Sequence, residues 1–191
     1  FREFVETLQL PFAETQAGKG ALVSDHPLNL GGVGVTGGLA ANQLAPQADL
    51  VIGIGTRLTD FTTGSKALFS HPDVEFLLLN VAEFDALKLD ATALIADAQT
   101  GLTALTHALK DYRSGWGEAI AEAKSAWRDE CRRLWDRQWH PADAPEVAGH
   151  LDAQLMEYGE TLNTRLTQTQ VLGLINQHVE DNAIVVGAAG S

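Results

Sequence analysis

The sequence is poor in several residue types on which other classes of protein depend. Its single cysteine, Cys131, cannot form a disulfide within the chain, which fits a reducing compartment such as the cytoplasm. Lysine and arginine number 13 against 25 aspartates and glutamates, and this net charge of -12 argues against nucleic acid, because phosphate binding needs clustered cations. No apolar run approaches the roughly 18 residues that a membrane span requires. The six histidines are scattered, without the spacing of metal ligands, so no metal site is predicted.

What the sequence does contain is an alternation of short apolar runs and helical patterns between residues 10 and 109. This alternation predicts an α/β fold in which helices flank a parallel sheet. The apolar runs lack the polar alternation of half-exposed strands, so we expect all of them to be buried. The expected strands are 11–14, 50–54, 76–79 and 93–96, and the expected helices are 2–9, 37–47 and 100–109.

The pattern changes after residue 110. A long charged helix is expected over 117–139, and its tryptophan-bearing apolar stripe is interpreted as packing against another domain or subunit, with an aromatic cofactor site as the alternative. Residues 140–164 contain two prolines and little periodicity, which is typical of a linker. Thr167 and Gln170 have the form of a capping box, which predicts a helix from about residue 168. A buried strand is expected at 183–186, as the start of a second, partial α/β unit.

Small residues in two loops make them candidate ligand sites. The loop 187–191 follows an expected strand, so its backbone N–H groups could approach a phosphate, although a plain turn explains the same composition. Gly53 and Gly55 begin like a dinucleotide-binding turn, but Leu58 stands where the third glycine of that pattern belongs. A tight turn and a ligand contact therefore both remain open for this glycine pair.

Charged residues near these loops also allow two interpretations. Arg57 and Asp60 could bind a phosphate and a ribose, or they could pair with each other at the edge of the sheet. Lys19 lies between two glycines and could contact a phosphate, yet the Ser or Thr of a P-loop does not follow it. The neighbours Asp25 and His26 suggest a hydrolytic triad, but the chain has no GxSxG elbow, which argues against that chemistry.

Several spaced motifs together resemble the central domain of the thiamine-diphosphate enzymes, with the acetolactate synthase and pyruvate oxidase group as the nearest large branch. The matching segments are 11–15, 18–20, 26–27, 31–38, 41–42, 48–53 and 55–57. The resemblance divides the chain into a central domain (1–110, its first strand missing), a helical and irregular linker (111–165) and the beginning of the cofactor-binding domain (166–191). Both ends look cut, so we expect a longer parent protein.

Within that family, the segments 80–85, 166–170 and 185–191 resemble the branch that hydrolyses a carbon–carbon bond of a cyclic 1,2-diketone in myo-inositol catabolism. This resemblance implies thiamine diphosphate and Mg²⁺, a small-molecule substrate and a cytoplasmic homo-oligomer. It implies no catalytic residue in this chain, because the glutamate that activates the cofactor and the aspartate that helps to hold the metal lie outside it. The alternatives are an acetolactate-synthase-like carboligase or decarboxylase and, from another class, a non-catalytic nucleotide-binding module.

The resemblance also implies binding residues. Ala189, Gly190 and Ser191 stand where the family's cofactor-binding domain touches the diphosphate. In flavin-binding relatives a pocket is lined at the positions of Gly55, Arg57, Asp60 and Asp97, so these four form a candidate residual nucleotide pocket. Leu78 and Val35 replace the acidic residue and the histidine of those relatives, which argues against FAD.

Overall fold

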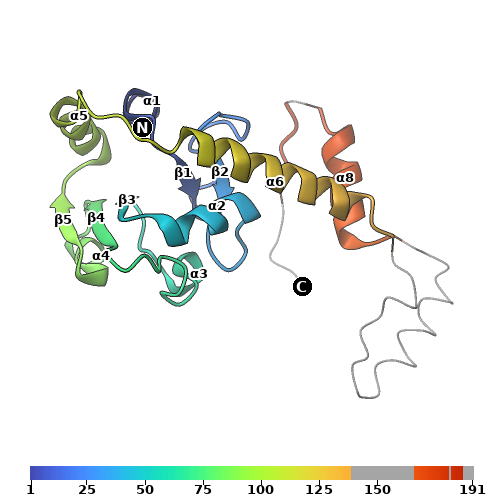
Figure 1. Cartoon of the computed structure of the whole chain (residues 1–191), viewed down its shortest axis with the longest axis horizontal. Helices are drawn as coiled ribbons and strands as arrows, with labels where there is room; N and C mark the ends of the chain where they lie inside the picture. Colours follow the sequence, from blue (N-terminus) through green and yellow to red (C-terminus); the bar gives the residue numbers. More distant parts are fainter. Residues whose placement is uncertain (139–165, 181, 187–191) are drawn as a thin grey trace, which may run out of the picture. The chain divides into compact units, whose positions relative to one another are not determined.

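The computed structural model describes residues 1–138, 166–180 and 182–186, and within them it shows the expected α/β fold (Figure 1). The chain divides into two compact units, Phe1–Trp127 and Arg128–Ser191. All strands of the described residues belong to the first unit, and helix α8 belongs to the second.

The strands of the first unit form two parallel sheets, which Figure 1 shows as separate groups of arrows. The smaller sheet pairs β1 with β2, and the larger has the order β3-β4-β5. The four strands expected from apolar runs are confirmed, whereas the Asn-Leu-Gly-Gly sequence of β2 has too few apolar residues to be noticed. The bounds are β1 Phe12–Glu14, β2 Asn29–Gly32, β3 Leu50–Ile54, β4 Glu75–Asn80 and β5 Thr92–Ile95.

The expectation that every strand would be buried is wrong for the larger sheet. Only β4 carries fully buried leucines, Leu78 and Leu79, each 1% exposed. Leu50 in β3 is 49% exposed and Ile95 in β5 is 48% exposed. β4 has a neighbour on each side, while β3 and β5 are edge strands whose outer sides no described strand covers.

Helices pack on these sheets through apolar side chains and, at one point, a glycine. α1 contributes Phe4, Val5 and Leu8 to the main core, and α5 contributes Leu102. Gly101 lets α5 approach β4, since a Cβ at that position would lie 2.6 Å from Leu79 Cδ1. The helices of this part are α1 Arg2–Leu8, α2 Leu39–Leu44, α3 Asp60–Thr63, α4 Glu83–Ala86 and α5 Ala98–Ala108, with 3₁₀ turns at Ala45–Gln47 and Lys88–Asp90.

The long helix α6 spans Gly117–Trp135. Its Ile120 and Ala123 are buried in the main core, against which Trp116 and Trp127 also pack. The ring of Trp127 lies over Gly38, where a Cβ would be 3.2 Å from the indole. The interpretation that the tryptophans pack on another domain or subunit is therefore wrong for Trp116 and Trp127, because periodicity identifies an apolar face but not the surface that covers it.

In the second unit, the last turns of α6 pack against α8, which spans Gln168–His178. Gly173 lies so close to the Trp135 side chain that no Cβ would fit there. Thr169 Oγ1 donates a hydrogen bond to the carbonyl oxygen of Leu134 at 3.0 Å. A glycine and a short polar side chain thus allow the two helices to meet closely.

The predicted start of α8 is confirmed, but only half of the capping box forms. Thr167 Oγ1 accepts a hydrogen bond from the backbone N–H of Gln170 at 3.1 Å. The reciprocal contact is missing, since Gln170 Oε1 is buried without a hydrogen-bond partner. At the start of α8, the side chain of the N-cap Thr167 is therefore the part of the box that satisfies a backbone N–H.

The expected buried strand at 183–186 is wrong. No strand is formed there, and Ile184, Val185 and Val186 are 90%, 71% and 91% exposed. The apolar run identifies a segment that is suited to a sheet. Without a neighbouring strand, it cannot satisfy its backbone groups within a ladder.

A glycine-rich loop over 31–38 joins β2 to α2 and packs on α3. Gly34 has a φ of 113° and lies so close to the carbonyl oxygen of Phe61 that a Cβ would collide with it. The side chain of Asn42 forms two hydrogen bonds with the same glycine. Its Oδ1 accepts from Gly34 N at 3.1 Å, and its Nδ2 donates to Gly34 O at 2.8 Å. The loop conformation thus requires glycine for two separate reasons.

We expect Gly34→Ala to lower the free energy of unfolding by at least about 3 kcal/mol, since it adds backbone strain and a collision with another backbone. The matched control is Gly20→Ala, because Gly20 also has a positive φ (91°), yet a Cβ at that position would meet nothing within 4 Å. Gly20→Ala should lower the free energy of unfolding by about 1 to 2 kcal/mol. Urea unfolding followed by tryptophan fluorescence measures both, and equal losses would contradict this account.

Candidate functional site

The turn after β3 is built by contacts to β4 and within itself. Gly55 has a φ of 60° and donates its N–H to the carbonyl oxygen of Leu79 at 2.9 Å. Asn80 Nδ2 donates to the carbonyl oxygen of Thr56 at 3.3 Å, and Thr56 Oγ1 accepts from Leu58 N at 3.3 Å. The tight-turn interpretation therefore accounts for Gly55, whose positive φ disfavours other residues.

No ion pair joins the charged residues of the candidate nucleotide pocket. Arg57 and Asp60 are both exposed, and no ion pair joins them, so the interpretation that they pair is wrong. Asp97 is the N-cap of α5, where its Oδ1 accepts from Gln99 N at 2.9 Å and from Thr100 N at 3.2 Å. Its carboxylate is thus engaged in stabilising the helix start.

A cavity of about 580 Å³ lies in the first unit, along the edges of β1 and β3. Of the four residues of the candidate nucleotide pocket, only Gly55 lines it. Its polar side chains are those of Glu14, Asp49 and three threonines, and no lysine or arginine is among the residues that line it. A diphosphate in this cavity would therefore meet no cationic side chain.

Glu14 is a buried carboxylate for which the sequence alone suggested no role. It is 7% exposed, and its Oε1 accepts hydrogen bonds from Gly20 N at 3.0 Å and Ala21 N at 2.9 Å. These bonds close the loop that follows β1. In the sequence, the role of Glu14 is indicated only by its position as an acidic residue at the end of an apolar run. A glycine-bearing loop, which carries the exposed Lys19, follows it.

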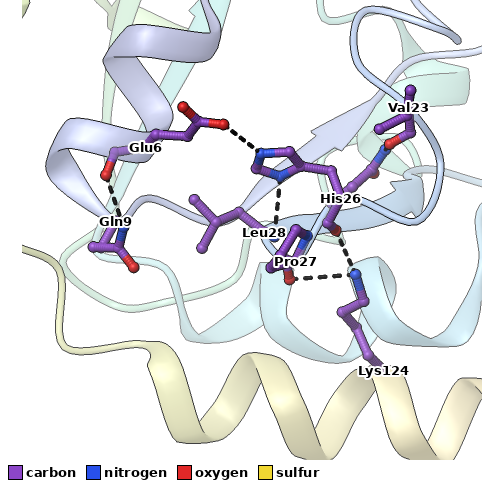
Figure 2. A network of polar contacts seen from close by, with 8 residues as sticks. Glu6, Gln9, Val23, His26, Pro27, Leu28 and Lys124 are labelled. Carbon is purple, nitrogen blue, oxygen red and sulfur yellow. Dashed lines mark hydrogen bonds and ion pairs between the residues drawn. The ribbon is translucent and has the colours of Figure 1, made fainter.

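His26 is held in a structural network, shown in Figure 2. Its Nδ1 accepts from Leu28 N at 3.2 Å, so the proton lies on Nε2, which donates to Glu6 Oε1 at 3.1 Å. Lys124 on α6 donates through Nζ to the carbonyl oxygens of His26 at 2.6 Å and Pro27 at 3.2 Å. Both ring nitrogens are thus occupied by contacts that fix the loop before β2.

The described part of the chain offers no cluster of metal ligands, because no group of three or more His, Cys, Asp or Glu residues in it is placed to hold a metal ion. No helix among the described residues is long and apolar enough to cross a membrane. The diphosphate contacts predicted for Ala189, Gly190 and Ser191 lie outside the described residues.

Parallel strands, covering helices and a glycine turn at the carboxyl end of β3 define a nucleotide-fold α/β domain. Residues 1–105 match the family of the thiamine pyrophosphate enzyme central domain, and the chain belongs to this family.

Proteins named 3D-(3,5/4)-trihydroxycyclohexane-1,2-dione hydrolase are similar to the whole chain. The one from Geobacillus thermodenitrificans (strain NG80-2) is 56% identical over 191 residues, which is 100% of this chain and 30% of the relative. The one from Bacillus cereus (strain AH820) is 55% identical over 193 residues, with the same shares covered. The chain thus spans about 30% of the length of these relatives.

We expect Lys124→Met to lower the free energy of unfolding by about 1 to 2 kcal/mol, because methionine keeps the apolar stem but removes charge-assisted hydrogen bonds to two carbonyl oxygens. Lys110→Met, which removes the same charge from an exposed position, is the control and should be nearly neutral. Urea unfolding midpoints compare the two. Equal stability of both variants would rule out a stabilising role for the Lys124 contacts.

The surroundings of the lone thiol, Cys131, oppose its ionisation. Burial raises the pKa of Cys131, and the neighbouring Glu130 carboxylate raises it further. Glu130 itself stays ionised, because the hydrogen bonds from Arg133 at 2.6 and 2.7 Å lower the pKa of its carboxyl group. A thiol with a raised pKa is mostly protonated at neutral pH, and the protonated form is a poor nucleophile.

We expect Cys131 to react with iodoacetamide at pH 7.5 more slowly than free cysteine, with a rate that rises as the pH passes above 9. Glu130→Gln should accelerate the reaction, because it removes the negative charge that opposes thiolate formation and leaves Arg133 nearby. Asp129→Asn is the control on the same turn, since Asp129 pairs with Arg132. Mass spectrometry follows the modification, and equal rates in the two variants would contradict the assigned cause.

Proposed function

We propose that this chain is the central part of a thiamine-diphosphate-dependent enzyme that hydrolyses a carbon–carbon bond of a cyclic 1,2-diketone in myo-inositol catabolism. The supporting observation is the 56% identity, over all 191 residues, to a relative named for hydrolysis of such a dione. The family match ends at residue 105, whereas the similarity to this relative continues through the rest of the chain. Residues 106–191 therefore favour this branch over the family in general.

In this proposal the chain acts as a scaffold and contains no catalytic residue. When bound, thiamine diphosphate supplies the electron sink for carbon–carbon cleavage. The cavity offers a diphosphate no cationic side chain, so the proposed contact to the cofactor rests with Ala189, Gly190 and Ser191. Their small side chains would let backbone N–H groups approach the phosphate oxygens. Mg²⁺ would be held by residues of the longer protein, as the resemblance implies.

We further propose that the enzyme is a cytoplasmic homo-oligomer. The single cysteine supports a reducing compartment. Exposed apolar side chains around α4 support contacts to another subunit or domain, because Val81 is 72%, Phe84 81% and Leu87 59% exposed. Such clusters on a protein surface usually mark interaction sites.

We expect a protein as long as the relatives, supplied with thiamine diphosphate and Mg²⁺, to consume the trihydroxycyclohexane dione. It should release about one proton per turnover, because hydrolytic ring opening produces a carboxylic acid that ionises at neutral pH. A pH-stat follows the proton, and pyruvate is the control substrate. The 191-residue chain alone should show no turnover. Carbon dioxide and acetolactate from pyruvate would favour the carboligase alternative, and dione cleavage by the 191-residue chain would overturn the scaffold role.

A non-catalytic nucleotide-binding module is the second candidate, and the glycine turn at the carboxyl end of β3 favours it. In that case Gly55, Arg57, Asp60 and Asp97 would contact the nucleotide. Calorimetry of the chain with NAD, FAD and ADP separates the candidates, because micromolar binding of any of them would support a nucleotide pocket. We expect no FAD binding, since the fully buried Leu78 stands where flavin-binding relatives place an acidic residue.

A further inference from the structure

A second, smaller cavity of about 210 Å³ lies on the face of the larger sheet that carries Leu78. Phe76 lines it from β4 and points to the same face as Leu78, because side chains two positions apart along a strand do so. The remaining lining comes from the end of α3, from the residues that follow α3 and from the 3₁₀ turn after α4. The residues that line this cavity, called the Phe76 cavity below, are Thr63, Lys66, Phe69, Phe76, Leu89 and Asp90.

Two of the segments around the Phe76 cavity hold a backbone conformation that side chains disfavour. Gly64, Ser65 and Lys66 follow one another with φ of 56°, 54° and 71°. Leu89 and Asp90 follow one another with φ of 59° and 54°. Positive φ costs free energy at every residue that carries a Cβ, so successive residues rarely adopt it. Such outliers concentrate at ligand-binding and active sites, where the surrounding structure holds them.

The buried Thr63 holds the first of these segments. Its side-chain hydroxyl donates to the carbonyl oxygen of Thr59 at 3.1 Å and accepts from Lys66 N at 3.1 Å. Ser65 N also donates to the carbonyl oxygen of Asp60 at 2.8 Å. These bonds fix the backbone of Lys66 at the edge of the cavity in a conformation that it would not adopt by itself.

The Phe76 cavity combines an apolar floor with a charged rim. The half-buried rings of Phe69 and Phe76 meet edge to face, with their centroids 6.0 Å apart, and the half-buried Leu89 completes the apolar lining. Lys66 and Asp90 are exposed and supply one charge of each sign. Within the described part of the chain, neither side chain takes part in an ion pair or a hydrogen bond.

The volume and the charges together select a small zwitterion with an apolar body. An apolar cavity of about 150 Å³ holds benzene, so this cavity has room for an apolar group of that size and a small head group. Asp90 would repel a simple anion, and Lys66 would repel a simple cation, whereas a carboxylate and an ammonium on one ligand match both. At the exposed rim these charged groups stay partly hydrated while the apolar body leaves the water.

We propose that the Phe76 cavity binds a free α-amino acid with an apolar side chain. Lys66 binds the carboxylate and Asp90 binds the ammonium. The apolar side chain lies between Phe69, Phe76 and Leu89. None of the four residues of the candidate nucleotide pocket lines this cavity, so the site does not depend on the nucleotide-binding alternative.

Titration calorimetry with L-leucine tests the proposal on a protein as long as the relatives. We expect a Kd of about 1 mM or lower for a ligand of this size. 4-Methylpentanoate lacks the ammonium and 3-methylbutylamine lacks the carboxylate. Each should bind about 10-fold or more weakly than leucine, because a charge-assisted contact is lost. Glycine, which lacks the apolar body, should lose at least as much affinity.

Two variants locate the bound leucine. Asp90→Asn should weaken leucine binding about 10-fold or more and should not weaken the binding of 4-methylpentanoate, which has no ammonium. Lys66→Met should likewise weaken leucine binding and should not weaken the binding of 3-methylbutylamine, which has no carboxylate. The controls are Asp111→Asn and Lys110→Met, which remove the same charges from exposed positions that do not line the cavity, and both should bind leucine as the unmodified protein does.

Three outcomes would overturn the proposal. The first is no leucine binding at about 10-fold above the expected Kd. The second is that 4-methylpentanoate or 3-methylbutylamine binds the unmodified protein as tightly as leucine, so that only one charge is recognised. The third is unchanged leucine binding in both Asp90→Asn and Lys66→Met, which would place leucine elsewhere. The comparison of ligands needs no variant, and no measurement needs catalytic activity, so a failure here leaves the proposed hydrolase function untouched.

Discussion

The pairing of β4 with a parallel strand on each side is the constraint on which the rest of the first unit depends. It directs the adjacent Leu78 and Leu79 to opposite faces of the sheet, where they belong to two different hydrophobic clusters. On one face Gly101 lets α5 approach Leu79, and on the other Leu78 packs with Leu58 and Ala86. One strand thus anchors both layers of helices.

Glycine positions set how closely the elements approach one another. Gly101 brings a helix to the sheet, Gly38 brings the glycine-rich loop to Trp127, and Gly34 brings the same loop to the backbone of α3. Contacts of this kind use backbone atoms and cannot be retained by a larger residue. These contacts fix how closely the joined elements can lie.

Polar side chains serve the same structural purpose, some of them buried, such as Glu14 and His26, and one of them, Asp97, exposed. Glu14 closes the loop after β1, His26 and Lys124 fix the loop before β2, and Asp97 begins α5. Each contacts backbone groups and satisfies hydrogen-bond donors or acceptors of the main chain.

Local patterns in the sequence predicted the family and most of the longer elements, but not β2, α3 or α4. The apolar run of β3 identified its bounds to the residue, the Thr167 cap marked the start of α8, and the glycine at 55 marked a turn. These features depend on propensities and hydrogen bonds among near neighbours, which a short window of sequence contains. The N-cap Asp97 was not predicted, since the helix was expected to begin at residue 100, although Asp before a helical pattern is a local signal.

Only the tertiary structure decided burial, pairing and the convergence of side chains. Apolar composition could not show that Leu50 would border an open edge, that Trp116 and Trp127 would cover the chain's own core, or that 183–186 would lack a partner. Nor could spacing show that Arg57 and Asp60, three residues apart, would both face solvent without pairing. Each of these outcomes depends on which segments, distant in the sequence, pack against the residue. The residue's neighbours along the chain do not determine that packing.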